Sequence, residues 1–379
     1  MSRRNGESPD EKPTIIDIMR GHAKKHEELV LNIWENAPED LQNPSLVEGV
    51  SSIVIEAFES KHSRELYFKA KDSGESKERE RLWIEGLDLT MLPRHIKDFS
   101  IVGFGTMEMK LDLRPLIALE HLKKLELVGA FEGTDVSPLG ECSNLRDLDL
   151  NFKIEGSLEF LARLRKIERI RFRHTSANNQ TNLKQLSDRI YIRTKQLNHR
   201  INLEPLSECH ALQHLNISCE DYVDLRPLEA CAKLVYLHVT GVIGLHLLSS
   251  PFLRKLDLSN GVLVNPWESY TMIPYKDKIK KDDVLDLRQL DGCESLERID
   301  LSRNYLRTME LDIFREIEVG GRRGTIPMID LRTNPLIAVY LPDGLIPKGH
   351  RIDDYLRVDS DVPVINDFDK YGRYIAEQL

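Results

Sequence analysis

The stretch DLRPLEACAKLVYLHV, residues 224–239, recurs with small changes along this chain of 379 residues. Three of the five intervals between successive copies are 22 or 23 residues, and a fourth, of 45, equals two such periods. Self-similarity at a fixed period of about 20–29 residues predicts a solenoid in which each repeat forms one coil. The other copies are DLRPLIALEHLKKLEL (112–127), DVSPLGECSNLRDLDL (135–150), SLEFLARLRKIERIRF (157–172, a degenerate copy), NLEPLSECHALQHLNI (202–217) and DLRQLDGCESLERIDL (286–301).

The second half of each copy has the pattern LxxLxL, which Leu234, Leu237 and Val239 show in the opening stretch. Successive side chains of a strand point to opposite faces, so these apolar residues point inward and the residues between them face solvent. Strands of neighbouring coils then stack in parallel about 4.8 Å apart. Because one coil cannot bury its apolar edge alone, stacked coils must share a continuous core.

The first half of each copy predicts a tight turn. Pro227 stands where a short helical turn would begin, a position at which the missing N–H of proline costs nothing. Asp224, just upstream, is a residue that favours turns. Pro115, Pro138 and Pro205 repeat the arrangement. We therefore expect a short 3₁₀ turn on the convex side of each coil and the strands on the concave side.

Over residues 81–342 the chain resembles the leucine-rich-repeat family, specifically its short internalin-like class with repeats of about 22 residues. The resemblance implies an α/β solenoid: a horseshoe with parallel concave strands and short 3₁₀ turns on the convex side, flanked by terminal caps. Members of the family usually carry an Asn three residues after the last strand leucine, where it bonds the backbone of adjacent coils. In this sequence, Asn occupies that position clearly only at Asn304 and Asn334.

The same register predicts strands outside the clear copies and about ten coils in all. They lie at Phe99 and Ile101 in 94–103, at Ile190 and Ile192 in 187–194, in 252–260 and in 328–336.

The flanks are expected to close the solenoid, because repeat arrays need end pieces with a polar outer face. Residues 1–13 are polar and predict a disordered tail, 14–80 an N-terminal cap and 343–379 a C-terminal cap. Within these flanks we expect helices over 14–36 and 365–379 and a charged loop over 72–81. Strands are expected at 51–58, 65–70 and 82–87, with a helix as the alternative for 51–58.

Four of the five cysteines, Cys142, Cys209, Cys231 and Cys293, occupy one repeat position, which Leu119 and Leu164 fill in other copies. A position that accepts Leu or Cys is an interior one, so buried free thiols are predicted. Disulfides would need an oxidising compartment, for which the sequence gives no other sign, and there is no paired CxxC spacing for zinc. We therefore expect a cytoplasmic protein without a cofactor.

No motif of the GxxxxGK[ST], HExxH or GxSxG kind occurs, so we do not expect an enzyme. His22 and His26 have a spacing that could hold a metal, but no third ligand accompanies them. Residues 234–253 lack charged side chains, yet polar residues interrupt them and their leucines follow the repeat register, so membrane insertion is not expected. Asp149, Asp257, Asp300 and Asp330 recur at the solvent-facing strand position, where polar residues belong.

Charge reverses in one part of the chain. Residues 163–200 hold eleven Lys and Arg against Glu168 and Asp188, a charge of +9, whereas the whole chain carries −9. Several of these arginines should point from concave strands, and Arg and Tyr are frequent hot spots of interfaces. The predicted partner-binding residues are Arg169, Arg171, Arg173, Arg189, Tyr191, Arg193, His214, Asn216, Tyr236 and His238.

The insertion 262–284 interrupts the repeats. Loops longer than about 15 residues in compact arrays are either functional or disordered, and both interpretations stay open here. Its candidate contacts with a partner are Trp267, Tyr270 and Tyr275.

Two hypotheses for function follow. The first is a protein–protein interaction module or scaffold that binds an acidic partner surface through the basic concave patch. The alternative is binding of single-stranded RNA or DNA through the same Arg and Tyr side chains, against which the acidic total charge argues.

Overall fold

The computed structural model describes most of the repeat region and both of its ends. The described residues are 28–57, 75–104, 110–129, 131, 133–152, 154, 157–173, 200–218, 222–223, 225–240, 250–260, 287–324 and 326–378.

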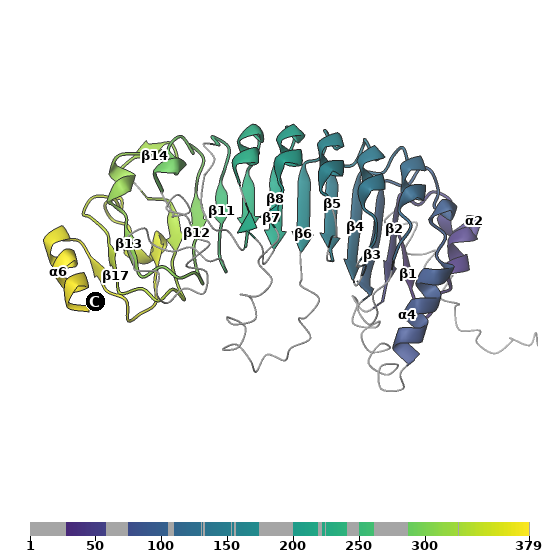
Figure 1. Cartoon of the computed structure of the whole chain (residues 1–379), viewed down its shortest axis with the longest axis horizontal. Helices are drawn as coiled ribbons and strands as arrows, with labels where there is room; N and C mark the ends of the chain where they lie inside the picture. The colour runs from purple at the N-terminus through teal and green to yellow at the C-terminus, as the bar shows by residue number, and fades with distance from the viewer. Residues whose placement is uncertain are drawn as a thin grey trace, which may run out of the picture.

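One long parallel sheet runs through the described part of the chain, and its strands stand side by side along the long axis of the molecule (Figure 1). Each strand pairs in parallel with its neighbours, so the stack grows by one coil per strand. In order, its twelve strands are β1 (Glu28–Asn32), β2 (Ser52–Glu56), β3 (Asp98–Phe104), β4 (Lys124–Gly129), β5 (Asp147–Asn151), β6 (Arg169–Arg173), β8 (His214–Ser218), β10 (Tyr236–Val239), β11 (Lys255–Asp257), β12 (Arg298–Asp300), β16 (Met328–Asp330) and β18 (Leu356–Arg357).

A row of 3₁₀ turns lies opposite the strands, as the prolines predicted (Figure 1). The turn is held at its start by a polar side chain two residues upstream: Asp112 Oδ1 accepts from the backbone N–H of Arg114 at 3.0 Å, and Asn202 Oδ1 accepts from that of Glu204 at the same distance. The turns are η3 (Arg114–Ala118), η4 (Ser137–Glu141), η5 (Glu159–Arg163), η6 (Glu204–Glu208), η7 (Arg226–Ala230) and η9 (Leu287–Leu290).

The core lies between the strands and the turns. Leu234, Leu237 and Val239 have no exposed surface, which confirms the inward leucine positions. Leu237 is in register with Leu215 on one side and Leu256 on the other, so each leucine packs on its equivalent in the next coil. The predicted interior cysteines are confirmed as buried free thiols: Cys142, Cys209, Cys231 and Cys293.

The N-terminal flank differs from the sequence prediction. Residues 28–32 form β1 rather than part of a helix, because the buried Leu29, Leu31 and Ile33 alternate with the period of a strand. The strand predicted at 51–58 is confirmed as β2, whereas 65–70 lies outside the described residues. Both β1 and β2 belong to the long sheet, so stacking begins within the segment expected to form the cap.

The charged loop predicted over 72–81 and the strand predicted over 82–87 were also wrong. Both segments contribute to α4 (Glu75–Gly86), whose Arg81 bonds Glu78 and Glu85 at helical spacing. Trp83 is buried and donates through Nε1 to the carbonyl of Asn36, which docks the helix near η1 (Pro38–Gln42) and α2 (Pro44–Val47).

β6 hydrogen-bonds directly to β8 over five registered positions, so no strand of the long sheet lies between them. A strand was predicted in this interval, over residues 187–194. That segment lies outside the described residues. A short pair, β7 (Arg200–Ile201) and β9 (Tyr222–Val223), stands apart from the long sheet.

The C-terminal coils carry a second sheet of three parallel strands, β13 (Thr308–Glu310), β17 (Ala338–Tyr340) and β19 (Val364–Ile365). The predicted C-terminal helix is confirmed as α6 (Phe368–Gln378), which packs Phe368 and Tyr371 against Tyr340. The remaining elements are η2 (Leu89–Met91), η10 (Asp312–Arg315), the hairpin of β14 (Glu318–Val319) and β15 (Arg322–Arg323), and η11 (Ile352–Asp354). Among the described residues, no helix has the length and apolarity needed to cross a membrane.

Candidate partner-binding face

Two rows of outward-facing side chains cross the concave face, because the strand register places equivalent residues of adjacent coils side by side. On the central strands the first row contains Arg169, His214, Tyr236 and Lys255. The second row, two residues further along each strand, contains Arg171, Asn216, His238 and Asp257. The structure thus brings together six of the predicted residues: Arg169, Arg171, His214, Asn216, Tyr236 and His238.

Each arginine of β6 pairs with the aspartate beside it on β5. Arg169 Nη2 lies 2.8 Å from Asp147 Oδ2, and Arg171 Nη1 donates to Asp149 Oδ2. The arginine side chains are 57% and 49% exposed, whereas the aspartates are only 22% and 7% exposed. The guanidinium groups therefore reach further into solvent than the carboxylates that accompany them.

The first row continues from Arg169 as a series of ring and cationic groups. The His214 and Tyr236 rings are 6.4 Å apart, and Lys255 Nζ lies 5.0 Å from the centre of the Tyr236 ring, within the range of a cation–π contact. Burial raises the pKa of Tyr236, so its hydroxyl is protonated at neutral pH. Sequence reasoning missed Lys255, although it occupies the strand position equivalent to Tyr236 and could have been found from the register.

In the second row, His238 lies beside the carboxylate of Asp257. His238 Nδ1 lies 3.1 Å from Asp257 Oδ2, and Asp257 Oδ1 also accepts from the hydroxyl of Ser259. Burial raises the pKa of Asp257, but the hydrogen bonds from His238 and Ser259 outweigh it and hold that pKa at about 2. Asn216 Oδ1 is buried and has no hydrogen-bond partner in the described chain.

Of the other predicted site residues, one lies on the same strand as Arg169 and Arg171. Arg173 belongs to β6 and pairs in register with Ser218. The rest lie outside the described residues: Arg189, Tyr191, Arg193, Trp267, Tyr270 and Tyr275.

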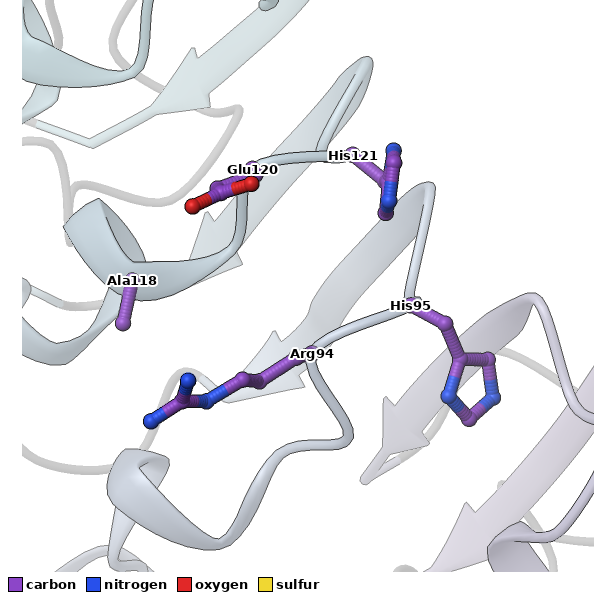
Figure 2. Close-up of a pocket in the computed structure, with 5 residues that line it drawn as sticks. All are labelled: Arg94, His95, Ala118, Glu120 and His121. Atoms are coloured by element: carbon purple, nitrogen blue, oxygen red, sulfur yellow. The ribbon is translucent and has the colours of Figure 1, made fainter.

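An open pocket lies away from this face, between two adjacent coils where the chain approaches β3 and β4. It is lined by Arg94, His95, Ala118, Glu120 and His121, and the imidazoles point to the opposite side from Arg94 and Glu120 (Figure 2). The carboxylate of Glu120 is therefore not directed at the imidazoles. In the part of the chain that the structure describes, no three His, Cys, Asp or Glu side chains are grouped to hold a metal ion.

The registered parallel strands, the opposing 3₁₀ turns and the shared leucine core define a leucine-rich-repeat solenoid. No family model matches the chain, and no curated protein matches its sequence.

Solved structures resemble it in fold. An internalin (inlF) from Listeria monocytogenes is 18% identical, with a TM-score of 0.33, over 57% of this chain and 64% of that one. An internalin C2 from the same organism is 14% identical, with a TM-score of 0.34, over 68% and 80%. A TLR13–ssRNA13 complex is 13% identical, with a TM-score of 0.41, over 83% and 45%. Because these similarities are low, the assignment of the leucine-rich-repeat fold rests on the strand register of this chain.

Proposed function

We propose that this protein is a non-catalytic protein-interaction module or scaffold whose partner binds the concave face over β6, β8 and β10. A rigid stack of coils presents side chains from several strands as one extended surface, which suits it to hold another protein. The register of β6, β8 and β10 gathers polar and aromatic side chains of adjacent strands into one surface there.

The proposal of an acidic partner rests on the difference in exposure between the arginines of β6 and the aspartates of β5. Arg169 and Arg171 project past Asp147 and Asp149, so an incoming carboxylate meets guanidinium N–H groups first. A guanidinium has five N–H donors, and the aspartates engage only part of them. The partner's acidic side chains can therefore add charge-assisted hydrogen bonds without displacing the aspartates.

A nucleic-acid ligand fits the same face less well. A phosphate backbone carries negative charge along its whole length, and the net charge of −9 on this protein opposes its approach. A protein partner can instead place its acidic residues over β6 alone.

The buried thiols support a cytoplasmic location. Cys142, Cys209, Cys231 and Cys293 are free, and free thiols persist in reducing compartments.

The test compares Arg169→Gln/Arg171→Gln with the control Arg146→Gln/Arg163→Gln, which removes two exposed, ion-paired arginines located off the concave strands. The probes are poly-L-glutamate and single-stranded oligo(dT). We expect the concave variant to bind poly-L-glutamate roughly tenfold more weakly and the control to bind it like the wild type. Equal binding by all three proteins would contradict the proposal. Tighter binding of oligo(dT), with a log–log salt slope of about −3.5, would favour the nucleic-acid alternative.

A further inference from the structure

A second group of arginines lies on the concave face, toward its C-terminal end. Arg298 belongs to β12, Arg332 follows β16 directly, and Arg357 belongs to β18, the neighbour of β16 in the long sheet. Arg332 and Arg357 face outward because Leu331 and Leu356, the residues before them, are buried. We call these three residues the C-terminal arginine cluster, and Arg169 with Arg171 the β6 pair.

The C-terminal arginine cluster repeats the arrangement of the β6 pair, with exposed guanidinium groups over a covered carboxylate. Arg332 Nε and Nη2 donate to the two oxygens of Asp330 at 2.9 and 2.6 Å. The side chain of Arg332 is 50% exposed, whereas that of Asp330 is 1% exposed. Arg298 Nη2 lies 3.1 Å from Asp300 Oδ2 and 3.8 Å from Asp330 Oδ2, and the exposed Arg357 is in register with Asp330. The outer surface of the cluster is therefore cationic.

Arg332 keeps donors for a partner. A guanidinium has five N–H groups, and no bond within the described chain occupies Nη1 of Arg332. The nearby carboxylate of Asp359 accepts instead from the backbone N–H of Thr333, at 2.7 Å. An incoming carboxylate can therefore bond Arg332 without displacing Asp330.

The carboxylates between the β6 pair and the cluster are largely covered. Asp257 and Asp300 are each only 14% exposed, and they contact His238 and Arg298 respectively. Lys255 on β11 adds a further cation to this part of the face. Five strand spacings separate β6 from β16, which sets the β6 pair and the cluster about 24 Å apart along the sheet.

We propose that the partner docks at two acidic points about 24 Å apart, one on the β6 pair and one on the C-terminal arginine cluster. This inference rests on the proposed function and adds to it a second contact and a spacing. A partner helix would cover the distance in about 16 residues and an extended segment in about seven. Because both contacts belong to one stack of coils, the second contact forms within the complex and strengthens binding beyond either contact alone.

The test uses peptides of fixed length as rulers. Fluorescein-labelled peptides carry two Glu-Glu pairs separated by one, five or twelve prolines, which place the pairs about 9, 22 and 43 Å apart in a polyproline helix. All three carry the same charge, so non-specific attraction is equal. We expect the five-proline peptide to bind the full-length wild-type chain about tenfold more tightly than the other two in fluorescence anisotropy. Replacing one Glu-Glu pair with Gln-Gln should remove this advantage.

Variants assign the two contacts. Arg169→Gln/Arg171→Gln and Arg332→Gln/Arg357→Gln should each abolish the preference for the five-proline peptide. The control Arg146→Gln/Arg163→Gln, located off the concave strands, should keep it. Arg357→Glu leaves the contact of Arg332 with Asp330 intact and should weaken binding of the five-proline peptide at least about threefold.

The outcomes separate this inference from the proposed function. Equal binding of the three peptides, or a preference that both C-terminal variants retain, would overturn two-point docking. If binding still required the β6 pair, the proposed function would stand. A preference that survives loss of the β6 pair would overturn both, as would peptide binding that depends on neither group of arginines.

Discussion

Arg171 on β6 donates through Nη1 to Asp149, its register partner on β5. The two residues are 22 positions apart in sequence, one repeat period, so a single pair links two coils across the concave face. The carboxylate is almost covered while the guanidinium is half exposed. The same pair thus stabilises the stack and presents a cation to a partner.

Removing this arginine should destabilise the fold, because it takes the cationic partner from a buried carboxylate. We expect Arg171→Ala to lower the free energy of unfolding by about 1–3 kcal/mol. Arg163→Ala, which breaks the exposed pair with Glu141, should cost under about 1 kcal/mol. Urea unfolding of both variants measures the difference, and equal costs would contradict the burial of Asp149.

Asn334, in the last coils, should contribute more to the free energy of unfolding than Arg171 does. Asn334 Oδ1 accepts from the backbone N–H groups of Asn304 and Leu306, and its Nδ2 donates to the carbonyls of Leu301 and Leu331, which follow β12 and β16. Asn334→Ala leaves these buried groups unsatisfied, so we expect a loss of roughly 2–4 kcal/mol in urea unfolding. The control Asn144→Ala removes a half-buried Asn whose two hydrogen bonds, to Glu120 and Lys166, are exposed to solvent, so it should cost under about 1 kcal/mol. A similar cost for both variants would show that Asn334 does not hold adjacent coils together.

The four interior cysteines should resist thiol reagents in the folded protein. Burial raises the pKa of Cys209 to about 12 and that of Cys231 to about 11, which leaves little reactive thiolate at pH 8. Cys219 lies outside the described residues, so the experiment uses Cys219→Ser. We expect Ellman's reagent to label this variant at least about a hundredfold more slowly in buffer than in denaturant. Rapid labelling of the folded variant would show that the repeat position faces solvent.

Acid should weaken the fold through Asp257. Its folded pKa of about 2 lies below the ordinary value of 3.8, so its contribution is complete above about pH 4 and is lost as the pH falls toward 2. The difference corresponds to about 2 kcal/mol. Unfolding curves between pH 5 and 2 should therefore show a shallower fall for Asp257→Asn than for the wild type. Parallel pH profiles would mean that His238 and Ser259 do not lower the pKa of Asp257 in the folded state.

The sequence by itself determined the architecture. The spacing of leucines and prolines is a local property repeated in each coil, and one coil can bury its leucines only by stacking on the next. The same periodicity placed Cys209 and Cys231 inside and His214 and Tyr236 on the concave face. The period also implied that residues 22 positions apart lie side by side, as Arg171 and Asp149 do.

Tertiary structure decided what the repeat pattern does not encode. Residues 28–32 pair with β2, and the helix over 75–86 packs on η1, contacts outside the repeat pattern. The direct pairing of β6 with β8 likewise joins strands 45 residues apart, which a period of 22 residues does not predict. On the binding face, the sequence pattern placed Asp149 at a solvent-facing strand position, whereas the structure pairs Asp147 and Asp149 with the arginines and nearly covers the carboxylate of Asp149. Side-chain length decided this, since a long arginine can bond a neighbouring short aspartate and still reach solvent.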